Sequence, residues 1–377
     1  MSGIYIHIPF CKQACHYCDF HFSTSTKKKE DMVLALAKEM ELRKDEFQNE
    51  VVETIYFGGG TPSVLSIDNI RFLIHSVYQN YDVIENPEIT LEANPDDLDG
   101  ETILQFANSP INRLSIGIQS FFEDDLQLMN RAHNSEEAKK CLAFATQYFD
   151  NISIDLIYGM PNMSNEKWLQ NIETAISYNI PHISSYALTV EPKTALHKMI
   201  KTGTISSLDD DLVKQHFHIL IDKLHENGFV HYELSNFGKP NYFSKNNTAY
   251  WLGKKYIGIG PSAHSFNGES RSWNVSNNSL YLKAIAENKL PSESEILSKT
   301  DQYNEYIMTG LRTIWGVSLV KIETEFGSNY LDYLNQQADK YISDNLLKVE
   351  NNILKTTIKG KFLCDGIASD LFLLNLE

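Results

Sequence analysis

The chain has 377 residues, of which 33 are basic and 49 acidic, so its formal net charge is −16. Domains average about 150 residues, so this length predicts two or three domains, or one large α/β unit with an appendage. A composition of 42% hydrophobic and 22% charged residues excludes a disordered or fibrous chain. The acidic balance argues against a protein that wraps the nucleic-acid backbone, and we expect no nucleic-acid partner.

The apolar patterning and the cysteines indicate the cellular compartment of the protein. No stretch approaches the roughly 20 apolar residues of a membrane span, and the N-terminal residues lack the pattern of a signal peptide. We therefore expect a cytoplasmic, reducing location. Three of the five cysteines, Cys11, Cys15 and Cys18, lie within eight residues, which favours a metal or cluster site over disulfides. We expect Cys141 and Cys364 to be small buried hydrophobes.

The first half of the chain alternates between short β-rich runs and polar, helically periodic stretches. The expected strands are Ile4–Ile8, Thr54–Phe57, Glu88–Glu92, Arg113–Ile118, Asn151–Ile157 and His182–Leu188. Their spacing of about 25 to 50 residues is typical of βα units and a parallel sheet. We expect one helix over Glu30–Phe47 and another whose stripe runs from Val213 to Leu224, with Asn227 and Gly228 as its stop signal. Six units are too few for a closed eight-stranded barrel, which leaves a partial barrel or a doubly wound sheet.

The second half has a different character. Residues 239–275 are rich in Gly, Asn, Ser, Tyr and Trp, which predicts loops with short strands. Beyond them we expect helices over Asp301–Ile314, Ser318–Glu325 and Tyr330–Asp344, a hairpin of Leu347–Glu350 and Ile353–Thr357, and a last helix over Cys364–Leu374. The chain is therefore divided into a βα domain (1–238), a loop-rich segment that closes it (239–296) and a small, mostly helical, winged-helix-like domain (297–377).

The strongest motif is the CxxxCxxC formed by Cys11, Cys15 and Cys18, directly after the first expected strand. Thiolates are the usual ligands of iron–sulfur clusters, and three of them leave one iron of a cubane open to a small molecule. Structural zinc takes four ligands, and His16 is the available fourth, so a non-enzymatic zinc scaffold remains an alternative.

With Tyr17 before its last cysteine, this motif resembles that of the radical S-adenosylmethionine (SAM) superfamily. The run from Tyr5 to Cys11 (YIHIPFC) resembles the oxygen-independent coproporphyrinogen III oxidase family, and the resemblance extends over nearly the whole chain. It implies a partial (β/α)6 barrel and a 4Fe-4S cluster on the three cysteines. It also implies SAM at the open iron and an electron donor such as flavodoxin or ferredoxin.

The resemblance further implies a set of SAM-binding residues, which are Tyr5, Tyr17, Gly59, Gly60, Thr61, Glu92, Gln119, Arg131, Asp155 and Ala187. The residues alone allow plainer interpretations for several of them. The glycine run is also typical of an ordinary turn, and Glu92 of a solvated strand end. Arg131 fits a surface residue. Asp155 lies inside an apolar strand, where a charge is costly unless it is paired.

The aromatic residues and glycines between Tyr232 and Arg271 suit either a porphyrin or a packed loop. Here Asn247, Tyr250 and Trp251 match the HNxxYW region of the family's heme-chaperone branch, whereas Asn246 stands where that branch commonly has His. The heme-binding candidates are therefore Asn247, Tyr250, Trp251 and His264. If a histidine binds the heme iron, the candidates are His264, His231 and His16; otherwise heme is held without a strong axial ligand.

Two features separate the branches of the family. The oxidase branch extends its motif to CxxxCxxCxC, but Phe20 occupies that position here, and only ten residues precede Cys11. We therefore expect a heme chaperone that passes heme to acceptor apo-hemoproteins. The alternative is the oxidase itself, a SAM-dependent decarboxylase of porphyrin biosynthesis.

Whether SAM is turned over stays open, and a gating role for the cluster and SAM is a hypothesis. The charge of −16, with no basic aromatic patch, argues against an RNA-modifying radical SAM enzyme. The lack of further cysteine clusters argues against a peptide maturase.

Overall fold

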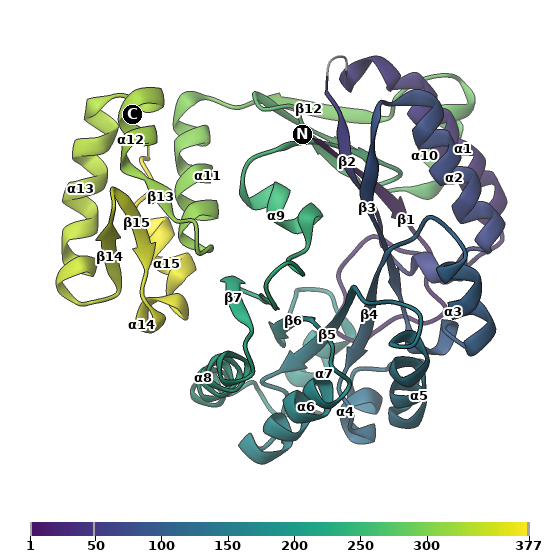
Figure 1. Ribbon diagram of the computed structural model, residues 1–377, viewed down its shortest axis with the longest axis horizontal. Helices are drawn as coiled ribbons and strands as arrows, with labels where there is room; N and C mark the ends of the chain where they lie inside the picture. Colours follow the sequence, from purple (N-terminus) through teal and green to yellow (C-terminus); the bar gives the residue numbers. More distant parts are fainter. Residues whose placement is uncertain (1, 48–49, 375–377) are drawn as a thin grey trace.

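Six parallel strands follow one another in the main sheet in the order in which they occur in the chain. The computed structural model describes residues 2–47 and 50–374. The strands are β1 (Ser2–Ile8), β2 (Val52–Gly59), β3 (Val83–Ala93), β4 (Arg113–Gln119), β5 (Ile152–Tyr158) and β6 (His182–Ala187). Each pairs in parallel with the next. All six expected strands are confirmed. A doubly wound sheet reverses its strand order, so that alternative is wrong, and the strands form an open barrel (Figure 1).

Helices between these strands cover the outside of the barrel. They are α1 (Lys29–Leu42), α2 (Ile67–Asn80), α3 (Gly100–Ala107), α4 (Glu123–Leu128), α5 (Ser135–Ala145), α6 (Asn165–Ser177), α7 (Ala195–Lys201) and α8 (Asp210–Glu226), with 3-10 turns at Lys44–Phe47, Pro62–Val64 and Pro95–Asp97. Ser66, Asp99 and Ser164 cap three of them by accepting a hydrogen bond from a first-turn N–H. The first helix ends at Leu42 and not at the expected Phe47. Helix α8 ends before Asn227, and this expectation is confirmed.

The barrel core is built from strands that bury both faces, as parallel strands between helices must. Every residue of β4 is buried, and Ile4, Ile6 and Ile8 of β1 are at most 1% exposed. Such strands hold their side chains in fixed directions, so the residues at their carboxyl ends are well placed.

Short antiparallel strands extend the sheet at both edges. At the β1 edge the elements are α9 (Lys245–Trp251), β9 (Lys255–Ile259), β10 (His264–Phe266), β11 (Ser270–Asn274), α10 (Asn278–Ala286) and β12 (Ser292–Ile296); at the β6 edge they are β7 (Val230–Glu233) and β8 (Asn236–Gly238). Of these, β9 is parallel to β1 and the others pair antiparallel. The expected short strands are present. The two helices of this segment were not expected, because each spans few turns and α9 shows no apolar stripe.

The C-terminal residues form a lobe with its own core around Tyr303, Ile307 and Leu334. Its elements are α11 (Lys299–Leu311), β13 (Val317–Ser318), α12 (Leu319–Lys321), a π-helical turn (Ile322–Phe326), α13 (Ser328–Ser343), β14 (Leu347–Glu350), β15 (Ile353–Thr356), α14 (Ile358–Lys361) and α15 (Cys364–Asp370). The order helix, strand, helices and hairpin is winged-helix-like. The last helix ends at Asp370 and not at Leu374. The domain boundaries themselves stay predictions.

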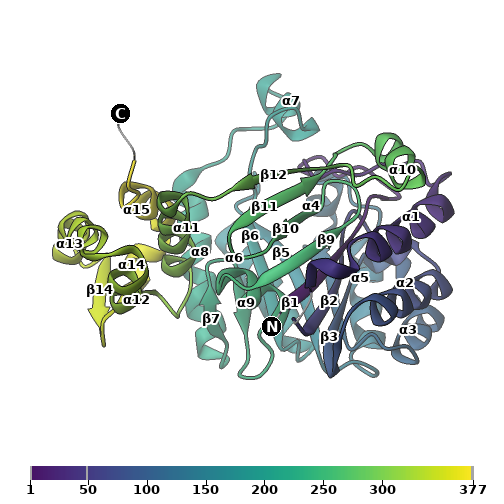
Figure 2. The same ribbon diagram turned by 90° about the horizontal axis from the view of Figure 1, so that it is seen from above.

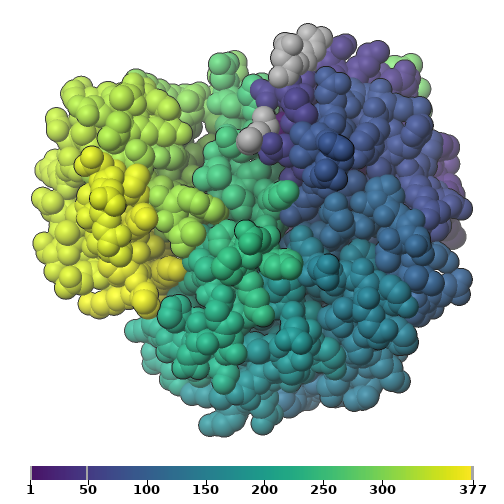
Figure 3. All heavy atoms as spheres, viewed as in Figure 1, coloured from purple at the N-terminus to yellow at the C-terminus, as the bar shows by residue number. Residues whose placement is uncertain are grey.

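The lobe stands beside the barrel in the ribbon and space-filling views (Figures 1, 2 and 3). Several contacts join the two, among them an ion pair between Arg271 and Glu305. The Ile314 N–H donates to the Tyr232 carbonyl at 3.0 Å, and the ring of Phe362 lies 5.6 Å from that of Phe217. Helix α9 lies between lobe and barrel in Figure 1, so it faces both.

Candidate functional site

The three clustered cysteines lie on a loop after β1, at the carboxyl ends of the parallel strands, where ligand sites of such sheets gather. All three are partly exposed, whereas Cys141 and Cys364 are buried, as expected. Burial raises the pKa of Cys18 to about 11 and also raises the pKa of Cys11, which accepts a hydrogen bond from Thr61 Oγ1 at 3.4 Å.

The residues between the cysteines tie the loop to the segment after α4. Gln13 Nε2 donates to both the carbonyl and the side-chain oxygen of Asn130 at 2.9 Å. In return, Asn130 Nδ2 donates to the Ala14 carbonyl at 2.8 Å. The His16 ring hydrogen-bonds through Nδ1 to the Leu128 carbonyl at 2.8 Å. The loop is therefore held by these neutral contacts together with the ion pairs of Lys12 to Asp96 and Asp97, none of which uses a thiol.

This donor set fits an iron–sulfur cluster better than a single metal ion. Among the described residues, no three His, Cys, Asp or Glu side chains are grouped as the ligands of one ion. The thiols that bind a cubane cluster attach to separate iron atoms and so need not converge on one point. Because the described side chains form no such group, the arrangement weakens the zinc alternative.

The glycine run at the end of β2 packs directly against this loop. The N–H of Gly60 donates to the Ile8 carbonyl at 2.9 Å, and that of Thr61 to the Phe10 carbonyl at 2.7 Å. A Cβ atom at Gly60 would lie 2.7 Å from the Phe10 oxygen and 2.8 Å from that of Ile8. Close backbone approach therefore requires glycine here, beyond what an ordinary turn needs.

Arg131 is not a surface residue. Its Nη2 donates to Asn94 Oδ1 at 2.6 Å and to the Gly117 carbonyl at 2.9 Å, and its Nη1 lies 3.2 Å from Cys15 Sγ and 3.4 Å from the Tyr17 hydroxyl. Its Nε is buried and has no hydrogen-bond partner. The guanidinium thus joins the cysteine loop to the ends of β3 and β4 and keeps one donor unused.

Two carboxylates face the barrel interior. The Tyr56 hydroxyl donates to Glu92 Oε1 at 2.8 Å, so Glu92 is not a solvated strand end. Burial raises the pKa of Glu92 to about 7 and that of Asp155 to about 6, and Ser184 hydrogen-bonds to Asp155. Two acidic groups in one enclosed space suit a ligand that carries positive charge.

The remaining SAM candidates are Gln119, Ala187 and Tyr5. Gln119 ends β4 with φ at 66°, a left-handed backbone that non-glycine residues rarely adopt. Ala187 ends β6, and the Tyr5 ring stacks on that of Tyr56 at 6.1 Å. Eight of the ten candidates thus lie at or near the carboxyl ends of the strands or in the adjoining loops, whereas Tyr5 and Asp155 lie in the middle of β1 and β5. The binding of SAM by all ten stays a prediction.

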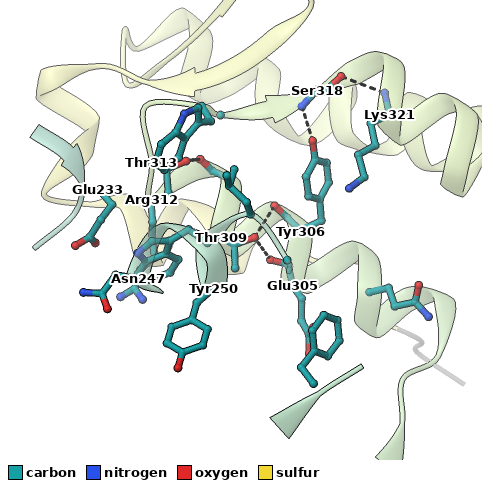
Figure 4. A pocket seen from close by; sticks show the side chains of 18 of the residues that line it. Glu233, Asn247, Tyr250, Glu305, Tyr306, Thr309, Arg312, Thr313, Ser318 and Lys321 are labelled. Carbon is teal, nitrogen blue, oxygen red and sulfur yellow. Dashed lines mark hydrogen bonds between the residues drawn. The ribbon is translucent and has the colours of Figure 1, made fainter. Parts of the chain in front are cut away.

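A cavity of about 900 Å³ opens between the barrel and the C-terminal lobe (Figure 4). Ligand pockets typically measure about 300 to 1,000 Å³. Its aromatic lining residues are Tyr186, Tyr250, Trp251, Tyr256, Phe266, Tyr306, Trp315 and Phe326, and its charged ones are Glu233, Arg271, Glu305, Arg312, Lys321 and Glu325. Its lining thus combines aromatic rings with charged groups of both signs.

Three of the four heme candidates, Asn247, Tyr250 and Trp251, line this cavity from α9. His264 does not: it is exposed on β10, beside Trp273. His231 stacks on Phe237 at 4.0 Å, and burial lowers its pKa to about 3. None of the lining residues found among residues 2–47 and 50–374 is a histidine or a cysteine, whereas four are tyrosines.

Asn246 points away from the cavity. Its Oδ1 accepts a hydrogen bond from Thr54 Oγ1 at 2.9 Å, and its N–H donates to Glu88 Oε1 at 3.2 Å. The side chain is buried against β1 and β2, where a Cβ atom at Gly3 would lie 3.3 Å from it. Asn246 is thus not a lining residue of the cavity, although its side chain also hydrogen-bonds to Tyr250, which is one.

Sequence reasoning missed the cavity residues of the lobe, such as Glu305, Tyr306, Arg312 and Trp315. They carry no motif of their own, because a contact between two separately folded parts has no fixed spacing along the chain.

Comparisons with known proteins agree with this arrangement. The radical SAM superfamily matches residues 5–175, and the HemN C-terminal domain matches residues 297–363. The chain is 34% identical to the heme chaperone HemW of Lactococcus lactis, covering 97% of this chain and 98% of that protein. It is 32% identical to the heme chaperone HemW of Bacillus subtilis, covering 96% and 97%.

The coproporphyrinogen III oxidase HemN of Escherichia coli, a solved structure, superimposes with a TM-score of 0.85 at 22% identity, covering 98% of this chain and 90% of that one. At this identity the match establishes the fold. No helix among the described residues has the length and apolar character needed to cross a membrane.

Proposed function

Because the chain belongs to the radical SAM superfamily and, within it, to the family of the heme chaperone HemW, we propose that it binds heme and delivers it to acceptor hemoproteins. The observation that carries the proposal is the aromatic cavity beside α9, in which Asn247, Tyr250 and Trp251 all take part. A porphyrin is flat, apolar across its face and carries carboxylates at one edge, which is the chemistry this cavity accommodates.

The oxidase alternative has less support. Decarboxylation would need a machinery that acts on propionates beside the SAM pocket, and the overall likeness to an oxidase structure concerns the fold only. Phe20, at the position of the oxidase motif's additional cysteine, has a largely exposed side chain, 70% of it open to solvent.

The proposed cofactors are a 4Fe-4S cluster on Cys11, Cys15 and Cys18 and SAM on the ten candidate residues. When bound, the cluster supplies one-electron reduction to SAM. The chain's own contribution is positioning: Arg131 fixes the cysteine loop, and Glu92 and Asp155 place negative charge where a cationic ligand sits. A flavodoxin or ferredoxin is the proposed electron donor, and the unpaired thiols suit the cytoplasm.

The test is a titration of ferric heme into anaerobically reconstituted protein, followed at the Soret band. We expect saturable one-to-one binding, and transfer to apomyoglobin when that acceptor is added. Absence of saturable binding would reject the proposal. SAM-dependent decarboxylation of coproporphyrinogen III in the same preparation would instead establish the oxidase alternative.

A further inference from the structure

Two arginines project into the cavity from opposite lobes. Arg271 comes from β11 on the barrel side, and Arg312 follows α11 in the C-terminal lobe. Each guanidinium lies over an aromatic ring of the cavity wall, Arg271 at 6.0 Å from the Phe266 ring centre and Arg312 at 5.5 Å from that of Trp251. Stacking of this kind holds the planar group in a fixed orientation and leaves its N–H edge directed at hydrogen-bond acceptors.

Both arginines already face carboxylates of the protein itself. Arg271 Nη2 lies 2.9 Å from Glu305 Oε2, which ties the barrel side to the lobe, while its Nε is buried without a partner. Arg312 binds Asp365 through Nε and Nη2, both at 2.7 Å. Asp365 is 54% exposed. Both ion pairs are partly open to solvent, so another carboxylate can reach the two guanidinium groups.

We propose that Arg271 and Arg312 form a carboxylate-binding pair that receives the two propionates of the porphyrin, exchanging Glu305 and Asp365 for them. The inference rests on the proposed function and deepens it, because it names the ligand class as a dicarboxylate tetrapyrrole and the residues that select it. The ring then lies along Tyr250 and Trp251. Arginine is suited to this task since its planar fork matches a carboxylate.

The third cation that lines the cavity, Lys321, is less suited than the two arginines to bind the propionates. The Lys321 ammonium lies over the Tyr306 ring at 4.4 Å and 3.7 Å from Glu325 Oε2. It belongs to a single helical stretch of the lobe and has no counterpart on the barrel side. A clamp that spans both lobes therefore involves Arg271 and Arg312.

The carboxylate requirement is tested by comparing ferric protoporphyrin IX with its dimethyl ester, which keeps the ring and iron but lacks the charges. We expect Arg271→Gln and Arg312→Gln each to raise the Kd of the acid about tenfold, since each removes a charge-assisted hydrogen bond. The Kd of the ester should not change. Arg71→Gln, on the exposed face of α2, is the matched control and should leave both values unaltered.

A variant that is expected to tighten binding distinguishes the loss of a specific contact from simple misfolding. Glu305→Gln removes the carboxylate that competes for Arg271, so it should tighten binding of the acid several-fold. Equal Kd values of the natural chain for acid and ester would overturn the inference while leaving heme binding intact. If neither porphyrin binds, the proposed function fails together with it.

Discussion

The cysteine loop and the interdomain cavity are two sites built in different ways. The loop and its surroundings come from the first half of the chain and are held by backbone and amide contacts of one core, such as those of Gln13 and Asn130. The cavity is assembled from α9, the added strands and a lobe with a separate core. The first site is therefore assembled within one core, whereas the second depends on how two cores sit against each other.

The largest effect should follow from Cys15→Ala, which should abolish cluster binding and leave heme binding at the cavity unchanged. We expect complete loss of the cluster's visible absorption and of bound iron and sulfide after reconstitution, because one of three thiol ligands is gone. Heme affinity should stay within about twofold, since the cavity has no residue of this loop in its wall.

The same variant tests the gating hypothesis. Heme transfer to apomyoglobin that proceeds at the natural rate without a cluster would show that the cluster does not gate release. A strong loss of heme binding by Cys15→Ala would mean that the two sites are coupled.

Gly60→Ala should be a damaging substitution at the cysteine loop. The added methyl would overlap the Phe10 and Ile8 carbonyls, which predicts a loss of about 1 to 3 kcal/mol in unfolding free energy, as for other overpacked sites. Cluster occupancy should fall in parallel. Gly366→Ala is the control, because nothing lies within 4 Å of its added methyl. Urea denaturation of both variants checks this, and equal midpoints would contradict it.

Trp251→Ala should weaken heme binding about tenfold without affecting the cluster, because it removes an aromatic wall of the cavity and the ring beneath Arg312. Trp273→Ala is the matched control, since Trp273 pairs with His264 outside the cavity. Soret titrations of the two variants make the comparison. An equal effect of both would contradict the proposal that heme binds in this cavity.

The acidic barrel interior predicts a pH dependence of SAM binding. Burial raises the pKa of Glu92 to about 7, so this group ionises as the pH rises from about 6 to 8, and affinity for a cationic ligand should then increase several-fold. The groups that act on Glu92 are Tyr56, Asp155 and Arg113.

The same shift has the opposite sign for stability. Since the folded-state pKa lies above the ordinary value, the folded protein loses stability as the pH rises toward and through about 7. Calorimetric titration with SAM across this range tests the first effect, and Glu92→Gln should flatten the slope around pH 7 and leave the part due to Asp155, whose pKa burial raises to about 6. An unchanged slope around pH 7 in that variant would assign it to another group.

The smallest effect on heme affinity is expected at position 246, where the chain departs from the family motif. Asn246→His should not improve heme affinity, because the side chain at 246 faces Thr54 and not the cavity. The bulkier ring should instead reduce stability by about 1 to 3 kcal/mol. His264→Ala, at an exposed position outside the cavity, should leave the heme Kd unchanged. Tighter heme binding by Asn246→His would show that α9 turns when heme binds.

The contrast between the sites also explains what could be predicted from sequence. The six strands and the cysteine loop follow from local patterns, since strand alternation and thiol spacing are properties of neighbouring residues. Arg131 and Glu92 needed the family resemblance, because an isolated arginine or strand-end glutamate is usually solvated. Arg312 and Tyr306 escaped prediction, as their role arises only when the lobe meets the barrel.

The orientation of Asn246 could not be foreseen either. A seven-residue helix without an apolar stripe does not reveal which of its faces is inward. Position 246 and position 250 are one turn apart in α9, yet the first is bound to β2 and the second lines the cavity. The helix is oriented by tertiary contacts with Thr54 and Glu88, which lie far away in sequence.

The separate core of the C-terminal lobe has a consequence for how such proteins diversify. Since the lobe folds around its own apolar residues and supplies one wall of the cavity, a lobe exchanged between relatives would bring new cargo contacts without disturbing the thiol loop. Ligand preference and cofactor chemistry are thus free to evolve at different rates, and chimaeras joined near residue 297 offer a direct way to reprogram one while keeping the other.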